Sequence, residues 1–219
     1  HTQRRRQRQM CIRDRECNEA LKMLKGNREE RIQGLRIFCE YRDQRSFPLL
    51  LPLLDQPCPV ERMSAVYALG RNPCPSAVQK LVSLLETDDN AYVRRATAWS
   101  LANYDNQIVL KPLINALKND VAAVRLWSSS SLAEIGNVSS KNAELAAEQL
   151  LISLKIDNES GVRSNCIWSL CRLFEKLDNT FQECFVDECT KIALFDKEPS
   201  VMEEAKTALD SMGMQGFYN

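Results

Sequence analysis

The chain has 219 residues, 44% of them apolar and 26% charged, with 29 Lys and Arg balanced by 29 Asp and Glu. This composition is typical of an ordered, soluble globular protein and excludes collagen-like, supercharged and disordered chains. The apolar stretches, such as residues 47–54, fall short of the roughly 18–20 residues that a bilayer span needs, so we expect no membrane insertion.

The first fifteen residues differ from the rest. Residues 1–9 (HTQRRRQRQ) have the Arg-rich, acid-poor composition of a nucleic-acid-binding arm or a transit peptide. Residues 10–15 (MCIRDR), however, resemble the translation of a transposon mosaic end used in sequencing libraries. We therefore interpret residues 1–15 as a non-native adapter segment. Without its six basic residues and one acidic residue, 23 basic and 28 acidic residues remain, a net charge of −5 that predicts no nucleic-acid partner.

Residues 16–212 contain an internal repeat. A nine-residue motif that opens with Val-Arg and closes with Leu begins at Val93, Val124 and Val162, and weaker copies begin at Glu30, Glu61 and Val201. The starts lie 31, 32, 31, 38 and 39 residues apart. Each interval is long enough for two helices and their turns, so we predict six helix pairs.

The first helix of each pair is predicted at an apolar stretch, and the second helix carries the motif. The five apolar stretches are residues 48–54, 77–85, 108–117, 146–154 and 185–194. Motif positions one, five and nine share one helical stripe, which predicts the buried face. Position five is small or nearly so (Gly34, Ala65, Thr97, Ser128, Cys166, Ala205), and position nine is large and apolar (Phe38, Leu69, Leu101, Leu132, Leu170, Leu209).

The turns between the two helices carry a recurring Asp, and the second motif position carries a recurring Arg. The acidic residues are Asp55, Asp88, Asp120, Asp157 and Asp196, and the basic residues are Arg31, Arg62, Arg94, Arg125 and Arg163. This pattern predicts a ladder of ion pairs along the stack; the alternative is that both are solvated charges at helix ends. Residues 137–143 and 178–182 are predicted as linkers that account for the two longer intervals.

Because no pair can bury its apolar face alone, we expect the pairs to stack as a right-handed all-α solenoid of about six short helix pairs, with a polar final repeat as a cap and residues 213–219 as a tail. The Val-Arg and small-residue columns resemble HEAT-like repeats, specifically the short form found in phycobilisome bilin lyases. The resemblance covers about residues 17–212.

This resemblance implies a cyanobacterial, cytoplasmic protein similar to bilin lyase subunits and to the non-bleaching proteins that assist phycobilisome degradation. Such a protein would bind phycobiliprotein subunits, and transiently their linear tetrapyrrole, on its concave face, and help to attach or detach the chromophore. The alternative is a non-catalytic adaptor that uses the same face to hold a protein unrelated to bilins. The sequence identifies neither the partner nor the oligomeric state.

Position seven of the second helices lies almost opposite the buried stripe, so its aromatic residues are predicted to face outward. Trp127, at position four, lies about 60° from this row. Arg71 and Arg172, nearby, are expected to meet carboxylates of a partner or propionates of a tetrapyrrole. The alternatives are rings covered by neighbouring helices and arginines that are simply solvated. The candidate partner-binding residues are Tyr67, Arg71, Trp99, Asn103, Trp127, Glu134, Trp168 and Arg172.

The sequence predicts no catalytic residue and no metal site. The one His is residue 1, which removes Ser-His-Asp, Cys-His and His-metal chemistry from the body of the chain. Phosphate-loop, dinucleotide and hydrolase motifs are absent, and any enzymatic role would be of the bilin lyase kind. The nine cysteines are spread through apolar helices at spacings that match no zinc site, which favours a reducing, cytoplasmic compartment.

Overall fold

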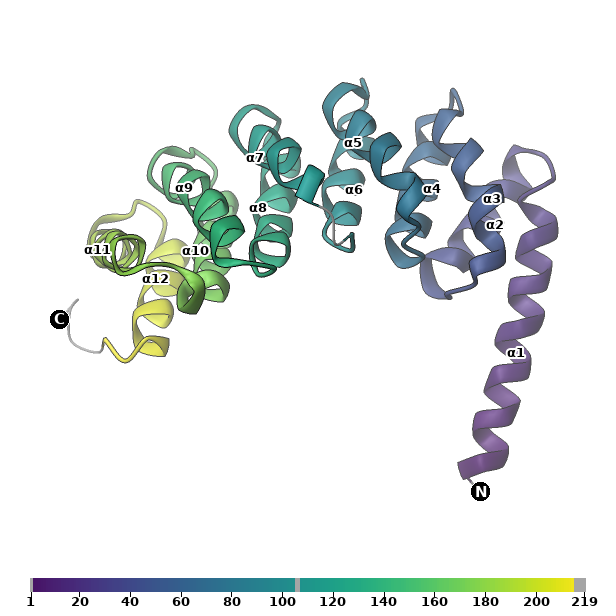
Figure 1. Ribbon diagram of the computed structural model, residues 1–219, viewed down its shortest axis with the longest axis horizontal. Coiled ribbons are helices and arrows are strands. Elements are labelled where there is room, and N and C mark those ends of the chain that lie inside the picture. Colours follow the sequence, from purple (N-terminus) through teal and green to yellow (C-terminus); the bar gives the residue numbers. More distant parts are fainter. Residues whose placement is uncertain (1, 105–106, 215–219) are drawn as a thin grey trace. The chain divides into compact units, whose positions relative to one another are not determined.

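The computed structural model describes residues 2–104 and 107–214. In these residues the chain forms twelve α-helices, five short 3-10 helices and no strand (Figure 1). The helices cluster into two compact units, His1–Tyr104 and Asp105–Asn219. Unit 1 holds α1 (Thr2–Met23), α2 (Arg28–Glu40), α3 (Phe47–Leu50), α4 (Pro59–Arg71), α5 (Val78–Thr87) and α6 (Ala91–Leu101). Unit 2 holds α7 (Leu110–Asn119), α8 (Ala122–Gly136), α9 (Ser140–Ile156), α10 (Ser160–Leu173), α11 (Asn179–Phe195) and α12 (Pro199–Ser211).

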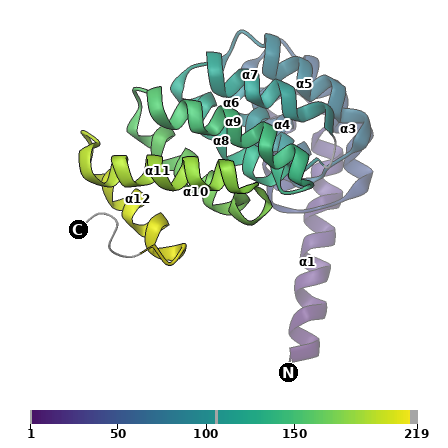
Figure 2. The same cartoon turned by 60° about the vertical axis from the view of Figure 1, so that its left-hand side comes forward.

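Within each unit the helices pack in the order of a repeat stack. Each odd-numbered helix pairs with the even-numbered helix that follows it, and the even-numbered helices pack on one another, α2 on α4 and α4 on α6 in unit 1, α8 on α10 and α10 on α12 in unit 2. In unit 2 the first helices α7, α9 and α11 also lie side by side (Figures 1 and 2). This arrangement confirms the predicted all-α solenoid fold and its six helix pairs.

The six second helices share the predicted register. Each begins two residues before its motif, so the motif start is the third residue of α2, α4, α6, α8, α10 and α12. Every residue at positions five and nine is buried, and all six large side chains at position nine are fully so. The small fifth position allows close packing: a Cβ on Gly34 would lie 3.0 Å from the carbonyl oxygen of Ala20 in α1.

The linker prediction was wrong for both longer intervals. Most of residues 137–143 and 178–182 belong to α9 and α11, which begin at Ser140 and Asn179 and are 17 residues long. Side chains just before each helix cap it: Ser139 accepts a hydrogen bond from the backbone N–H of Asn142, and Asp178 from that of Phe181. Such caps favour helix initiation, so the extra residues lengthen the first helices instead of the loops.

Helix α1 packs on α2 through its C-terminal part only. Cys17, Ala20 and Leu24 are buried, whereas the described side chains before Glu16 are exposed. Figure 1 shows the N-terminal half of α1 projecting beyond the other helices of unit 1. The segment interpreted from sequence as non-native, residues 1–15, therefore contributes no buried side chain among those that the structure describes. Of the predicted tail, residues 215–219 lie outside the described residues.

The predicted ion-pair ladder is present in both units. Arg62 Nε lies 2.7 Å from Asp88 Oδ2, Arg125 Nε lies 2.7 Å from Asp157 Oδ2, and Arg163 Nη2 lies 2.7 Å from Asp196 Oδ1. In each pair the Asp belongs to the turn of the following repeat. The same guanidinium donates through Nη1 to carbonyl oxygens of its own turn, so each Arg joins two successive turns.

The first rung of the ladder departs from the pattern. Arg31 does not pair with Asp55; its Nε donates instead to Glu61 Oε1 at 2.7 Å, and Glu61 is almost fully buried at motif position one of α4. Asp55 forms an exposed ion pair with Lys80. The reason is that Glu61 replaces the Val found at most motif starts. Its carboxylate, in the first turn of α4, lies within hydrogen-bond distance of Arg31.

Acidification is expected to weaken the fold through this ladder. Burial by itself raises the pKa values of Asp88, Asp157 and Asp196, but hydrogen bonds from the paired Arg and from the backbone N–H two residues later hold each pKa below its usual value. A carboxyl with a lowered folded-state pKa contributes stability that is complete above the unfolded pKa of about 3.9 and is lost as the pH falls through the folded pKa.

Urea unfolding measured in steps from neutral pH to about pH 3 tests this. The free energy of unfolding should fall below about pH 4–5, and Asp157→Asn should make that fall smaller, because one of the linked protons is gone. An equal fall in wild type and variant would show that Asp157 is not linked to folding.

Candidate functional site

The candidate partner-binding residues of unit 1 lie around two contacting rings on neighbouring second helices. Tyr67 of α4 and Trp99 of α6 are both half-buried, with ring centroids 5.3 Å apart and planes tilted by 54°. The Trp99 ring packs over Gly70, since a Cβ there would lie 2.5 Å from the indole. Tyr67 and Trp99, both at position seven, thus form one contacting pair of rings. Gly70, three residues after Tyr67, is small at the place where the Trp99 ring packs.

Arg95 was not among the predicted site residues, yet it belongs to the same cluster. Its Nη2 donates to the hydroxyl of Tyr67 at 3.3 Å, and its guanidinium lies 5.5 Å above the ring of Tyr92, which is 64% exposed. Arg95 is at position three of α6, a position that the motif leaves unassigned. The only sequence signal was a second Arg directly after the Val-Arg pair.

The two polar candidates of unit 1 lie at the C-terminal ends of α4 and α6. Arg71 is exposed, and its Nε donates to the carbonyl oxygen of Cys39 at 3.2 Å. Asn103 is exposed and donates to the carbonyl oxygen of Ser100, which satisfies one terminal carbonyl of α6. Both side chains are solvent-facing, as an interaction surface requires, but only Arg71 carries a charge.

The candidates of unit 2 form a more exposed surface on α8 and α10. Trp127 is 36% and Trp168 is 40% exposed. Arg172 lies with its guanidinium carbon 5.0 Å from the centroid of the Trp168 ring, and its Nη2 is 2.8 Å from Glu134 Oε1. Arg172 therefore already holds a carboxylate of its own chain, that of Glu134, one repeat earlier.

A polar cluster joins α10 to α8. Asn165 Nδ2 donates to the carbonyl oxygen of Leu126 and to the hydroxyls of Ser129 and Ser130, and Ser169 donates to the carbonyl oxygen of Ser129. Ser129 and Ser130 thus take part in the packing of α10 on α8. These hydrogen bonds join α8, which carries Trp127, to α10, which carries Trp168.

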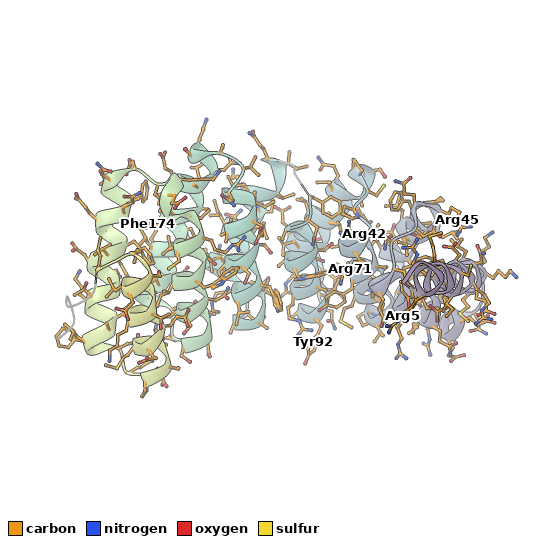
Figure 3. The ribbon with its side chains drawn as sticks, turned by 90° about the horizontal axis from the view of Figure 1, so that it is seen from below. Arg5, Arg42, Arg45, Arg71, Tyr92 and Phe174 are labelled. Atoms are coloured by element: carbon orange, nitrogen blue, oxygen red, sulfur yellow. The ribbon has the colours of Figure 1, made fainter. Side chains whose placement is uncertain are left out.

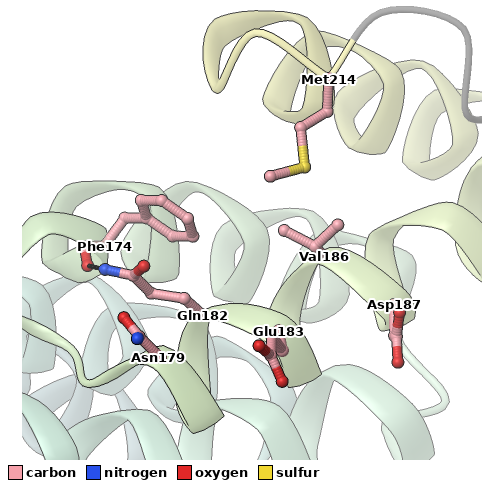
Figure 4. Close-up of a pocket in the computed structure, with 7 residues that line it drawn as sticks. All are labelled: Phe174, Asn179, Gln182, Glu183, Val186, Asp187 and Met214. Carbon is pink, nitrogen blue, oxygen red and sulfur yellow. Dashed lines mark hydrogen bonds between the residues drawn. The ribbon is translucent and has the colours of Figure 1, made fainter.

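Surface depressions of the described residues include three that are lined by other residues than the predicted site residues. The first, about 280 Å³ in volume, lies beside α11 between Phe174, Val186 and Met214 (Figure 4). The second, about 340 Å³, lies between the C-terminal ends of α7 and α9 and includes the Arg125–Asp157 pair. The third, about 170 Å³, lies between α1 and α2 beside Arg36.

Metal and membrane features are absent from residues 2–104 and 107–214. No group of three or more His, Cys, Asp or Glu is arranged to hold a metal ion. No helix in those ranges combines the length and apolarity required to cross a bilayer. All nine cysteines lie within the described part of the chain, and none forms a disulfide.

The fold and these surfaces define the class: an all-α repeat solenoid with aromatic and charged side chains on its second helices. The sequence profile of HEAT repeats matches residues 18–102 and, overlapping them, residues 78–171, which together make up more than half of the chain. The chain therefore belongs to the HEAT-repeat family. No curated protein gives a significant match to the sequence.

Solved structures share the fold at low sequence identity. A designed armadillo repeat protein in complex with the peptide (KR)4 is 18% identical, with 91% of this chain and 98% of that chain covered and a TM-score of 0.64. YibA of E. coli is 18% identical, with 94% and 76% covered and a TM-score of 0.65. Yeast importin-β is 15% identical, with 93% and 30% covered and a TM-score of 0.64. These likenesses show the fold alone.

Proposed function

We propose that this chain is a protein-binding HEAT-repeat module that holds phycobiliproteins on the outward faces of its second helices and assists their degradation or the attachment and detachment of their bilin. The observation that carries the binding role is the exposure of Trp127 and Trp168 on helices whose motif positions one, five and nine are buried. Large aromatic side chains are enriched among residues that dominate binding energy at protein interfaces.

The solved structures that share this fold support a binding role. One of them, a designed armadillo repeat protein, is in complex with a peptide. Another is a complex of yeast Kap95 with Nup1, in which 29% of that chain is covered at 16% identity and a TM-score of 0.63. A stack of helix pairs offers a long surface on which each repeat contributes side chains at equivalent positions.

The phycobiliprotein partner rests on the resemblance of the repeat columns to phycobilisome HEAT-like repeats. The propionates of a transient tetrapyrrole would find an available guanidinium at Arg71, whereas Arg172 already pairs with Glu134. A phycobiliprotein partner and nine unpaired cysteines both fit a reducing, cytoplasmic compartment. The competing role is that of an adaptor for a protein unrelated to bilins.

Mixing the purified chain with bilin-bearing phycobiliprotein discriminates the two roles. We expect a stable complex in gel filtration, with a change in visible absorbance or in zinc-stained bilin fluorescence if chromophore is attached or released. Absence of both binding and spectral change would remove the phycobilisome role and leave the adaptor role.

Replacement of Trp168 tests the binding surface itself. Trp168→Ala is expected to weaken partner binding by roughly tenfold or more, because truncated aromatic anchors at interfaces often cost above 2 kcal/mol. It should destabilise the fold less than Trp99→Ala, since the Trp99 ring packs over Gly70 and against Tyr67. Binding by titration calorimetry and unfolding by circular dichroism measure the two effects. Unchanged binding together with a large loss of stability would show that Trp168 is a core ring.

A further inference from the structure

Position eleven of the second helices carries an Arg in both units, but the two arginines have different partners. In unit 2, Arg172 of α10 binds Glu134, which holds position eleven of the preceding second helix. In unit 1, Arg71 of α4 and Glu40 of α2 occupy the equivalent positions. Yet Arg71 contacts only the carbonyl oxygen of Cys39, and it forms no ion pair with a carboxylate in the part of the chain that the structure describes. Nη donors of Arg71 therefore remain free to bind an external acceptor.

Two further exposed arginines of unit 1 lie in α2 or directly after it. Arg36 holds position seven of α2, the place that Tyr67 and Trp99 hold on α4 and α6, and Arg42 follows directly after α2. Neither forms an ion pair with any carboxylate of the described residues. Figure 3 shows Arg42 and Arg71 on the face of the molecule seen from below. We call Arg36, Arg42 and Arg71 the arginine surface.

The charge of the two units also differs. Residues 1–104 carry 18 Lys and Arg against 12 Asp and Glu, whereas residues 105–219 carry 11 against 17. These counts give a net charge of +6 for unit 1 and −6 for unit 2, but residues 1–15 supply six Arg and one Asp, so residues 16–104 by themselves have a net charge of +1. An acidic ligand is therefore repelled by unit 2 but not by residues 16–104 of unit 1, over the Debye length of about 8–10 Å at ordinary salt.

We infer that the arginine surface, with the ring of Tyr67 beside it, binds an acidic, Asp- or Glu-rich segment of a partner protein. The inference rests on the proposed binding role of the second helices, because Tyr67 and Arg71 belong to that surface. The chain contains its own template for the contact: at Arg172 a carboxylate is held at 2.8 Å while the guanidinium stacks on Trp168. A partner carboxylate at Arg71 would take the place that Glu134 takes at Arg172. Arginine suits this role because its planar guanidinium group can donate two parallel hydrogen bonds to a carboxylate.

The test measures binding of a fluorescein-labelled peptide of alternating Glu and Ala to the full chain by fluorescence anisotropy. We expect saturable binding that weakens as salt is raised, and none to the matching peptide of Gln and Ala. The double variant Arg36→Glu with Arg71→Glu should weaken binding roughly tenfold. Glu40→Gln should leave binding unchanged or strengthen it, because it removes the carboxylate that holds the position equivalent to Glu134.

Arg172→Glu is the matched control for Arg71→Glu alone, since it makes that single charge change at the same helix position in unit 2, and it should alter affinity by less than about twofold. Circular dichroism melts confirm that each variant folds. The inference would be overturned if Arg172→Glu weakened peptide binding as much as the double variant does. It would also be overturned if the double variant still bound the peptide fully, through the arginines of α1. Tighter binding of single-stranded DNA than of the acidic peptide would assign the surface to nucleic acid instead. Loss of phycobiliprotein binding on Trp168→Ala with no acidic-peptide binding would refute this inference and keep the proposed function.

Discussion

Arg163→Ala is expected to lower the free energy of unfolding by about 3–5 kcal/mol, because it leaves the buried carboxylate of Asp196 without its charged partner. The side chains of Arg163 and Asp196 are only 5% and 8% exposed, the most buried ion pair of the ladder. Arg163 binds both carboxylate oxygens, at 2.9 and 2.7 Å, and donates through Nη1 to the carbonyl oxygens of Asp157 and Asn158. One truncation therefore removes the link between two turns.

Lys80→Ala provides the exposed control for this prediction. Lys80 also forms an ion pair with an Asp, Asp55, but the two side chains are 41% and 65% exposed, so we expect a loss below about 1 kcal/mol. Replacing both buried partners, Arg163→Met with Asp196→Leu, should recover much of the stability, because no uncompensated charge remains. Urea unfolding followed by circular dichroism measures all three. An Arg163→Ala effect no larger than that of Lys80→Ala would mean that solvent reaches the pair.

Phe185→Ala is expected to cost about 3–5 kcal/mol, the usual loss when a fully buried aromatic side chain is truncated in a core. Phe185 lies in α11, has no exposed surface, and packs with its ring centroid 6.2 Å from that of Phe174. The cavity left behind would lie between α11 and the end of α10, where the surrounding helices cannot collapse without shifting the last repeat. Thermal and urea unfolding measure the loss.

Phe195→Ala makes the same change on the same helix at a different depth. Phe195 is the last residue of α11 and is 79% exposed, so its truncation should change the free energy of unfolding by less than about 0.5 kcal/mol. Equal costs at Phe185 and Phe195 would show that α11 is rotated relative to the structure described here. The pair thus tests the orientation of the helix as well as its burial.

Much of the repeat architecture was predictable from residue spacing. The common start of the motif, at the third residue of all six second helices, follows from a helical period that places positions one, five and nine on one face. Small residues at position five and large ones at position nine predicted which face is buried, and Gly34 against α1 shows why size matters there. The Arg-Asp ladder was predictable because the spacing between a motif Arg and the following turn repeats from unit to unit.

Other features depended on local chemistry that the repeat pattern obscured. Residues 137–143 contain Ser139 and residues 178–182 contain Asp178, both good helix caps, but polar composition was interpreted as loop and the helices were predicted to begin too late. Glu61 occupies a motif position where Val is usual, so its role as the partner of Arg31 was not predicted.

For the candidate site, the sequence alone determined which residues occupy equivalent positions, since equivalence depends only on register within a regular helix. It could not determine what each of those side chains contacts. Only the tertiary structure decided that Trp99 lies over Gly70, that Arg172 is paired with Glu134, and that Arg71 is not paired with Glu40. The physical reason is that side-chain contacts depend on distances and rotamers between neighbouring helices, which a one-dimensional period does not specify.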